Sequence, residues 1–125
     1  MNIRMAEYAA ALTHNRPQFH LSLIVDVSPN CDCHAENDVP ILPDIGMLAS
    51  TDMVAIDQAA ADLCCAAAPL PGGQLAKNLE KDPEGCKEHD HFHNSTPNSE
   101  WQSCLAHAEK IGAGTRQYEL IKLKL

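Results

Sequence analysis

The fold of this chain is decided by the stretch Phe19-His20-Leu21-Ser22-Leu23-Ile24-Val25-Asp26-Val27. Its odd-numbered residues are all apolar and alternate with a mostly polar even-numbered set, which is the period of a β-strand. Pro29 and Asn30 follow directly and predict that the strand ends there. On both sides of this strand the apolar residues return to helical spacing.

Three helices are predicted from that spacing, over residues 2–15, 52–68 and 99–111. Pro17 closes the first, and Gly112 suits the left-handed stop of the third. The second helix has an alanine-rich buried stripe that allows close packing.

Two further strands are expected at residues 45–49 and 117–125. Residues 74–98 contain few apolar side chains and indicate mostly loop, with one helical turn near 75–79. We therefore predict an α/β fold, in which a small mixed three-stranded sheet is covered by about three helices, forming one domain over residues 1–125.

Composition excludes several classes of partner. The chain has a net charge of −8, nine dispersed basic residues and five aromatic residues, so we expect no nucleic-acid ligand. No segment is long and apolar enough to span a membrane, and we expect no membrane partner. Residues 1–16 lack the pattern of a secretory signal, which favours the cytoplasm and reduced cysteines.

The motif Cys31-Asp32-Cys33-His34 directly follows the predicted strand. Two thiolates and an imidazole in one loop can bind zinc, iron or an iron–sulfur cluster. They supply at most three ligands of a closed shell, so at least one more must come from elsewhere. We interpret Cys31, Cys33 and His34 as metal ligands.

A second cluster contains Cys86, His89, His91 and His93. The short spacing lets neighbouring side chains reach one ion, and in an extended segment the three histidines would share a face. Such a run also suits nickel or copper, or it can be an ordinary solvated loop. We expect this loop to fold back and complete the site begun by Cys31 and Cys33, and to be held in place by the metal.

The other cysteines have a plainer interpretation. An even number of cysteines can indicate disulfides, but Cys64 and Cys65 lie in an alanine-rich helix, where a thiol packs as a small apolar group. Cys104 lies on the apolar face of the third helix and is expected to pack as well.

Several motifs in fixed order resemble a known family. They are Arg4 to Ala9, Cys31 to Cys33, Pro43 to Ser50, Asp52 to Ala59, and Ala108 to Gly114 with Tyr118 to Leu120. Together they resemble the carboxy-terminal part of the iron–sulfur-centre proteins that carry the domain of unknown function numbered 362. The resemblance covers nearly the whole chain apart from residues 69–88.

The resemblance implies an iron–sulfur association and a longer architecture, of which this chain is the C-terminal portion. Longer members carry a ferredoxin-like segment, which implies such a segment or a partner protein here. The resemblance also singles out Asp57 as a candidate metal ligand or base, with Asp44 as an alternative. Asp52 is better explained as a helix N-cap.

The sequence therefore leaves three functions open. The first is a metal-binding or iron–sulfur-associated protein that acts as an accessory in electron transfer. The second is an enzyme in which a divalent ion activates water with Asp57 as base. The third is a structural zinc module without catalysis.

Overall fold

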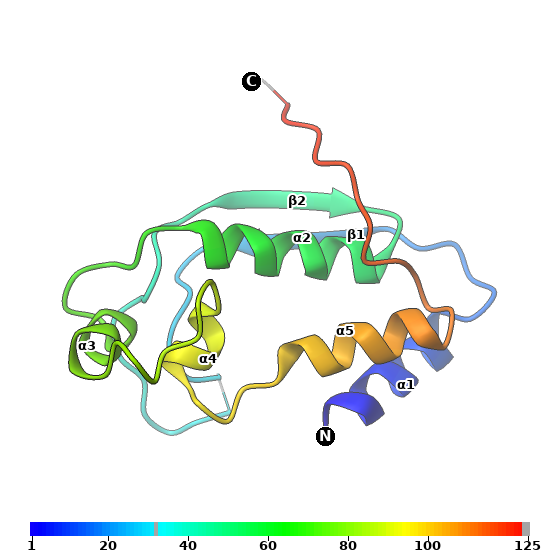
Figure 1. Cartoon of the computed structure of the whole chain (residues 1–125). Helices are drawn as coiled ribbons and strands as arrows, with labels where there is room; N and C mark the ends of the chain where they lie inside the picture. Colours follow the sequence, from blue (N-terminus) through cyan, green and yellow to red (C-terminus); the bar gives the residue numbers. More distant parts are fainter. Residues whose placement is uncertain (32, 124–125) are drawn as a thin grey trace. The chain divides into compact units, whose positions relative to one another are not determined.

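The computed structural model describes residues 1–31 and 33–123, which form an α/β fold (Figure 1). In chain order the elements are α1 (Asn2–Thr13), β1 (His20–Ile24), β2 (Gly46–Ser50), α2 (Met53–Ala66), α3 (Gln74–Lys81), α4 (His91–Ser95) and α5 (Trp101–Lys110). Three of these helices match the predicted ones to within two residues at each end, which is the usual uncertainty of helix boundaries. In the described residues no helix is both long and apolar enough to cross a membrane.

The described chain divides into two compact units. Unit 1 contains residues 1–22, 48–61 and 101–125, and unit 2 contains residues 23–47 and 62–100. The boundary passes through both strands and through α2. The expectation of a single domain stays a prediction.

The prediction of three strands is wrong for the described residues. The sheet has two antiparallel strands, β1 and β2, and residues 117–123 form no strand with them. In Figure 1 the chain after α5 runs away from that helix as an extended segment. Alternation gives a segment strand propensity, but a strand exists only where a neighbour pairs with its backbone groups.

In β1 the leucines of the alternating pattern are exposed, although the usual strand buries its apolar residues. His20 and Ser22 are half-buried and face inward, whereas Leu21 and Leu23 are 61% and 68% exposed. In β2, Met47 is likewise 64% exposed. A strand normally turns its apolar set toward the core, so this inversion directs polar side chains to the inner face of the sheet.

Unit 1 is built around the packing of α1 against α5, which lie side by side in Figure 1. Its core contains Ala6 of α1, Val54 of α2, and Leu105 of α5. Cys104 packs against this core, as predicted for a cysteine on the apolar face of α5. Asn2 also ties α1 to α5, because its side-chain amide donates a 3.1 Å hydrogen bond to the hydroxyl of Ser103.

Unit 2 has its own buried side chains, of which the largest are Ile41, Leu42 and Leu75. The loop before β2 is joined to the segment after α2 through backbone hydrogen bonds of Ile41. Its N–H donates to Val27 over 2.8 Å, and its carbonyl accepts from Leu70 over 2.9 Å. These bonds position the apolar residues that follow β1 and α2 in one core.

The helical turn predicted near residues 75–79 is part of α3, but the prediction that the rest of 74–98 is loop is wrong, because α4 lies there and contacts α3. Amide side chains join the two helices. Gln74 donates to the Ser95 carbonyl over 2.7 Å, and Asn78 donates to the Asn94 carbonyl over 2.9 Å. A segment with few apolar residues is thus held by buried hydrogen bonds, which periodicity of apolar residues does not reveal.

Asp52 caps α2, as predicted. Its Oδ1 accepts from the N–H groups of Val54 and Ala55 at 2.8 and 3.0 Å. Its Oδ2 accepts from the Thr115 N–H at 2.9 Å, so the same carboxylate also holds the chain that follows α5. An added side chain at Gly114 would collide with this carboxylate.

The stop of α5 at Gly112 is also confirmed. Gly112 has a φ of +77°, and the N–H groups of Gly112 and Ala113 donate to the Glu109 and Ala108 carbonyls at 3.0 and 2.9 Å. This is a Schellman motif, in which the left-handed residue turns the chain back over the end of the helix. The Glu109 carboxylate then accepts from both the backbone N–H and the Nε of Arg116 at 2.8 Å, which lowers the pKa of Glu109.

Candidate functional site

The loop of residues 28–37, which we call the thiol loop, carries the Cys-x-Cys motif within unit 2. Polar side chains close its base: the Asn37 amide donates to the Ser28 hydroxyl over 3.0 Å, and the Asn30 N–H donates to Asn37 Oδ1 over 3.3 Å. Short asparagine and serine side chains often bond backbone and neighbouring groups in this way and so set the shape of a turn. These bonds hold the base of the loop together, and the tip with Cys31 and Cys33 is exposed.

Cys31 and Cys33 are both exposed at the tip of the thiol loop, and both are free thiols. The two side chains are hydrogen-bonded to each other, and this bond together with the charge of Cys31 raises the pKa of Cys33. Two thiolates this close repel each other, and a bound cation would offset the repulsion. Asp32, between them, lies outside the described residues.

His34 follows the thiol pair and closes a turn, since its N–H donates to the Cys31 carbonyl over 2.9 Å. Its Nδ1 lies 3.7 Å from Glu36 Oε1, and both side chains are largely exposed. The structure therefore directs the imidazole of His34 toward Glu36. Among the described residues no three His, Cys, Asp or Glu side chains gather as a group that could hold a metal ion.

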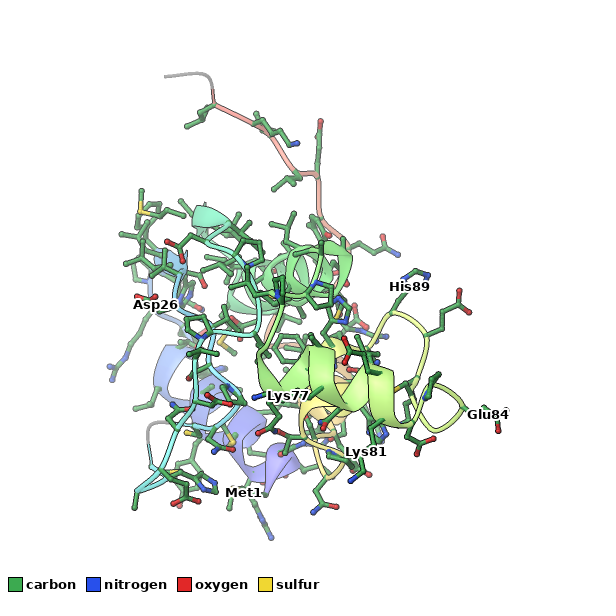
Figure 2. All side chains as sticks on the ribbon, turned by 90° about the vertical axis from the view of Figure 1, so that its left-hand side faces the viewer. Met1, Asp26, Lys77, Lys81, Glu84 and His89 are labelled. Carbon is green, nitrogen blue, oxygen red and sulfur yellow. The ribbon has the colours of Figure 1, made fainter. Side chains whose placement is uncertain are left out.

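The second predicted cluster is folded differently from the extended arrangement we considered. Asp90 caps α4 by accepting from the His93 N–H over 3.0 Å, and His91 and His93 are two residues apart on the helix. Side chains with this spacing on a helix do not share a face. His89 precedes the helix at a φ of +56° and is 80% exposed beside Glu88, and it points into solvent in Figure 2.

His91 is directed toward the end of α2 within unit 2, where its Nε2 lies 2.9 Å from the Ala67 carbonyl oxygen. A carbonyl only accepts, so Nε2 carries the hydrogen and Nδ1 is left as an acceptor. Nδ1 of His91 is buried and has no hydrogen-bond partner in the described part of the chain. His91 thus lies apart from its neighbours in the predicted cluster.

Cys86 and His93 do share a site, a pocket of about 540 Å³ between α3 and α4 that Asp82 and Ser95 also line. His93 Nδ1 and Ser95 Oγ are buried and have no hydrogen-bond partner within residues 1–31 and 33–123. The expected single centre that joins Cys86 and the histidines to the thiol loop is therefore not assembled in this structure. Amide hydrogen bonds of Gln74 and Asn78 join α3 to α4 in this segment, and its stabilisation by a metal stays a prediction.

Cys64 and Cys65 have the structural role that the sequence predicted. Cys64 is buried, and burial raises the pKa of its thiol to about 11, as expected for a thiol that packs as a small apolar group. Cys65 is half-buried and its pKa is raised for the same reason.

Asp57 belongs to unit 1, where it lines a pocket of about 350 Å³ that we call the Asp57 pocket. The pocket is formed by α1, β1 and α2, and its lining residues are Ala9, Leu12, Thr13, His20, Leu21, Ser22, Met53, Ile56 and Asp57. It contains one histidine and no cysteine. The sequence analysis identified Asp57 but missed His20 and Ser22, because the inverted face of β1 that turns them inward depends on the sheet's neighbours.

Asp57 is exposed, yet protein atoms around its carboxyl partly desolvate it, and this desolvation raises its pKa. The charge of His20 acts in the opposite direction and is the smaller effect.

A raised pKa in the folded state gives a pH dependence of stability. The native state binds this proton more tightly than the unfolded chain, so the stabilisation is fully present below the ordinary pKa of 3.8 and is lost as the pH rises through the raised value. We expect Asp57→Asn to increase the free energy of unfolding at pH 7 by no more than about 1 kcal/mol, because solvent screens a partly exposed group. Urea unfolding at a series of pH values would check this, and a variant less stable than the parent at pH 7 would contradict it.

These features define a small α/β protein with an exposed thiol pair in one unit and an acidic pocket in the other. Residues 1–62 match the sequence model of the family described as Domain of unknown function (DUF362), and the chain belongs to this family. The matched part includes the thiol loop and the Asp57 pocket, whereas Cys86 to His93 and the resemblance after residue 108 lie outside it. Neither the curated proteins nor the solved structures contain a significant match to the chain.

Proposed function

We propose that this chain is a metal-binding protein in which Cys31 and Cys33 ligate a soft metal, either iron of an iron–sulfur cluster or zinc, and that it acts as an accessory in electron transfer. The observation that carries the proposal is the pair of free, exposed thiols hydrogen-bonded to each other at the tip of a braced loop. Thiolates bind these metals strongly, and a preformed pair lowers the entropy lost on binding.

The ligand set that this chain offers is incomplete. Zinc and cluster iron take four ligands, and the thiol loop places two thiols together with His34 turned toward Glu36. We therefore propose that the remaining ligands come from a partner protein or a ferredoxin-like segment. An exposed loop suits this role, because a second polypeptide can reach the metal without unfolding the first. Reduced thiols fit a cytoplasmic location.

The alternative functions find less support. A metal-dependent enzyme with Asp57 as base needs metal ligands beside that carboxylate, and the lining of the Asp57 pocket contributes one histidine and no cysteine. A structural zinc that holds residues 74–98 in place would add little stability, because amide hydrogen bonds already join α3 to α4.

The proposal is tested by purifying the protein without oxygen and measuring bound metals and the visible absorption spectrum. We expect iron with a thiolate charge-transfer band, or colourless zinc, and we expect Cys33→Ser to lower the metal content by roughly tenfold or more, as is typical when a metal ligand or its immediate support is lost. Cys104→Ser is the matched control, since Cys104 packs against the unit 1 core.

His91→Ala and His93→Ala test whether the second cluster contributes to the same metal. We expect no change of metal content, since α4 points these side chains in different directions. The proposed function is overturned if the Cys31→Ser, Cys33→Ser double variant binds as much metal as the parent.

A further inference from the structure

We propose that the Asp57 pocket binds a small ligand that carries a primary ammonium group on a short apolar body. This site is separate from the thiol loop, and the proposal does not depend on metal binding. It rests on the hydrogen-bonding capacity, the charge and the walls of the pocket.

The polar groups of the pocket are arranged as acceptors. The Thr13 hydroxyl donates its hydrogen to the Ala9 carbonyl over 2.9 Å, which leaves its lone pairs for a ligand. His20 Nε2 lies 3.0 Å from the Gln18 Oε1, which can only accept, so Nε2 carries the hydrogen and Nδ1 of the neutral ring is an acceptor. The hydrogens of the Thr13 hydroxyl and of His20 Nε2 are thus used in bonds within the protein, and both side chains can only accept from a ligand.

The Asp57 carboxylate is the strongest acceptor of the pocket. Within the described part of the chain it makes no hydrogen bond or ion pair, and the lining of the pocket contains no lysine or arginine. Ser22 lies on the same inward face of β1 as His20 and adds a hydroxyl without a protein partner in these residues. A site that collects acceptors around one carboxylate without a hydrogen-bond or ion-pair partner favours a ligand with positive charge and several N–H donors.

The remaining walls are apolar. Ala9 and Leu12 of α1 and Met53 and Ile56 of α2 surround the polar groups, and the volume of about 350 Å³ lies within the range of small-ligand sites. A hydrated inorganic cation gains nothing from such walls, whereas an alkyl chain does. The net charge of −8 attracts cations to the molecule in general.

The inversion of β1 supports a binding role for the same residues. If packing alone determined the strand, Leu21 and Leu23 would face inward and His20 and Ser22 would be solvated. The inward face instead carries His20 and Ser22 together with the buried Ile24, while the two leucines stay exposed. Local departures of this kind from the usual pattern are expected at functional sites.

The test is an NMR titration of ¹⁵N-labelled protein with three probes at about pH 8, above the range in which histidine side chains ordinarily take up a proton. n-Butylammonium offers charge and donors, n-butyltrimethylammonium offers charge alone, and 1-butanol offers the apolar body with a single donor. We expect n-butylammonium to shift the amide signals of Thr13, His20, Ser22 and Asp57 and to bind at least roughly tenfold more tightly than either other probe, as charge-assisted hydrogen bonds imply.

Asp57→Asn should weaken n-butylammonium binding by roughly tenfold or more, because it removes the charge and keeps the shape. Asp62→Asn is the matched control, since it removes a carboxylate from the same helix outside the pocket and should leave binding unchanged. Preserved dispersion of the NMR spectrum shows that each variant is folded. Equal binding of all three probes, unchanged binding by Asp57→Asn, or shifts of these signals by Mg²⁺ or Zn²⁺ but not by the amine would overturn the proposal.

Discussion

Leu75→Ala is expected to lower the free energy of unfolding by about 2–5 kcal/mol, as is typical when a buried leucine is truncated. Leu75 is fully buried at 0% exposure and is among the largest side chains in the interior of unit 2. It also lies in the first turn of α3, next to Gln74, whose amide joins α3 to α4. A cavity at this position removes packing that holds α3 in place. The amide hydrogen bonds between α3 and α4 depend on the position of α3.

The effect of Leu75→Ala is measured by urea unfolding followed by circular dichroism, with Lys77→Ala as the control on the same helix. Lys77 is largely exposed and forms a 3.7 Å ion pair with Asp38, so its loss should cost less than about 1 kcal/mol. Equal stabilities of the two variants would show that the α3 region of unit 2 does not have the buried core described above.

Asp52→Ala is expected to lower the free energy of unfolding by about 1–2 kcal/mol, mainly because α2 loses its N-cap. The Val54 and Ala55 N–H groups lose the acceptor at 2.8 and 3.0 Å, and the Thr115 N–H loses its partner at 2.9 Å. Thr115 is exposed, so water replaces that bond at little cost. A decrease of this size lowers the melting temperature by several degrees in a chain of this length.

Asp52→Asn separates the two roles of this side chain. Asparagine is as good an N-cap as aspartate, but it offers one oxygen instead of two and can no longer accept from both α2 and Thr115. We expect near-parental melting for Asp52→Asn, together with faster hydrogen exchange at Thr115. If Asp52→Asn and Asp52→Ala melt at the same temperature, the cap does not stabilise α2.

The parts of the fold that the sequence predicted well depend on local interactions. The apolar periodicity of α2 and the cap at Asp52 lie within a few residues of each other, and the stop of α5 needs only Gly112 and its neighbours. Such features are specified by short stretches of chain and can be found without knowing the fold. The Cys-x-Cys loop is also a local feature, because its two thiols are only two residues apart and a turn closed by the His34 N–H brings them together.

The parts that were missed depend on distant residues. The period of β1 predicted a strand, but which face is buried depends on α1 and α2, whose residues line the Asp57 pocket with His20 and Ser22. The same limit applies to the histidine cluster. Asp90 caps a short helix there, and Asn78 bonds across to the carbonyls of Asn94 and Ser95, so in the described residues the four candidate side chains do not gather in one group.

The outward leucines of β1 affect the colloidal behaviour of the protein. A two-stranded sheet has two edges at which backbone groups are unpaired, and strands of other molecules can pair there. The exposed side chains of Leu21, Leu23 and Met47 add apolar surface that favours such pairing. At neutral pH the net charge of −8 keeps like molecules apart. Acid removes that charge and salt shortens its range to about 10 Å at 0.1 M. We therefore expect self-association of this chain to increase as the pH falls or the salt concentration rises.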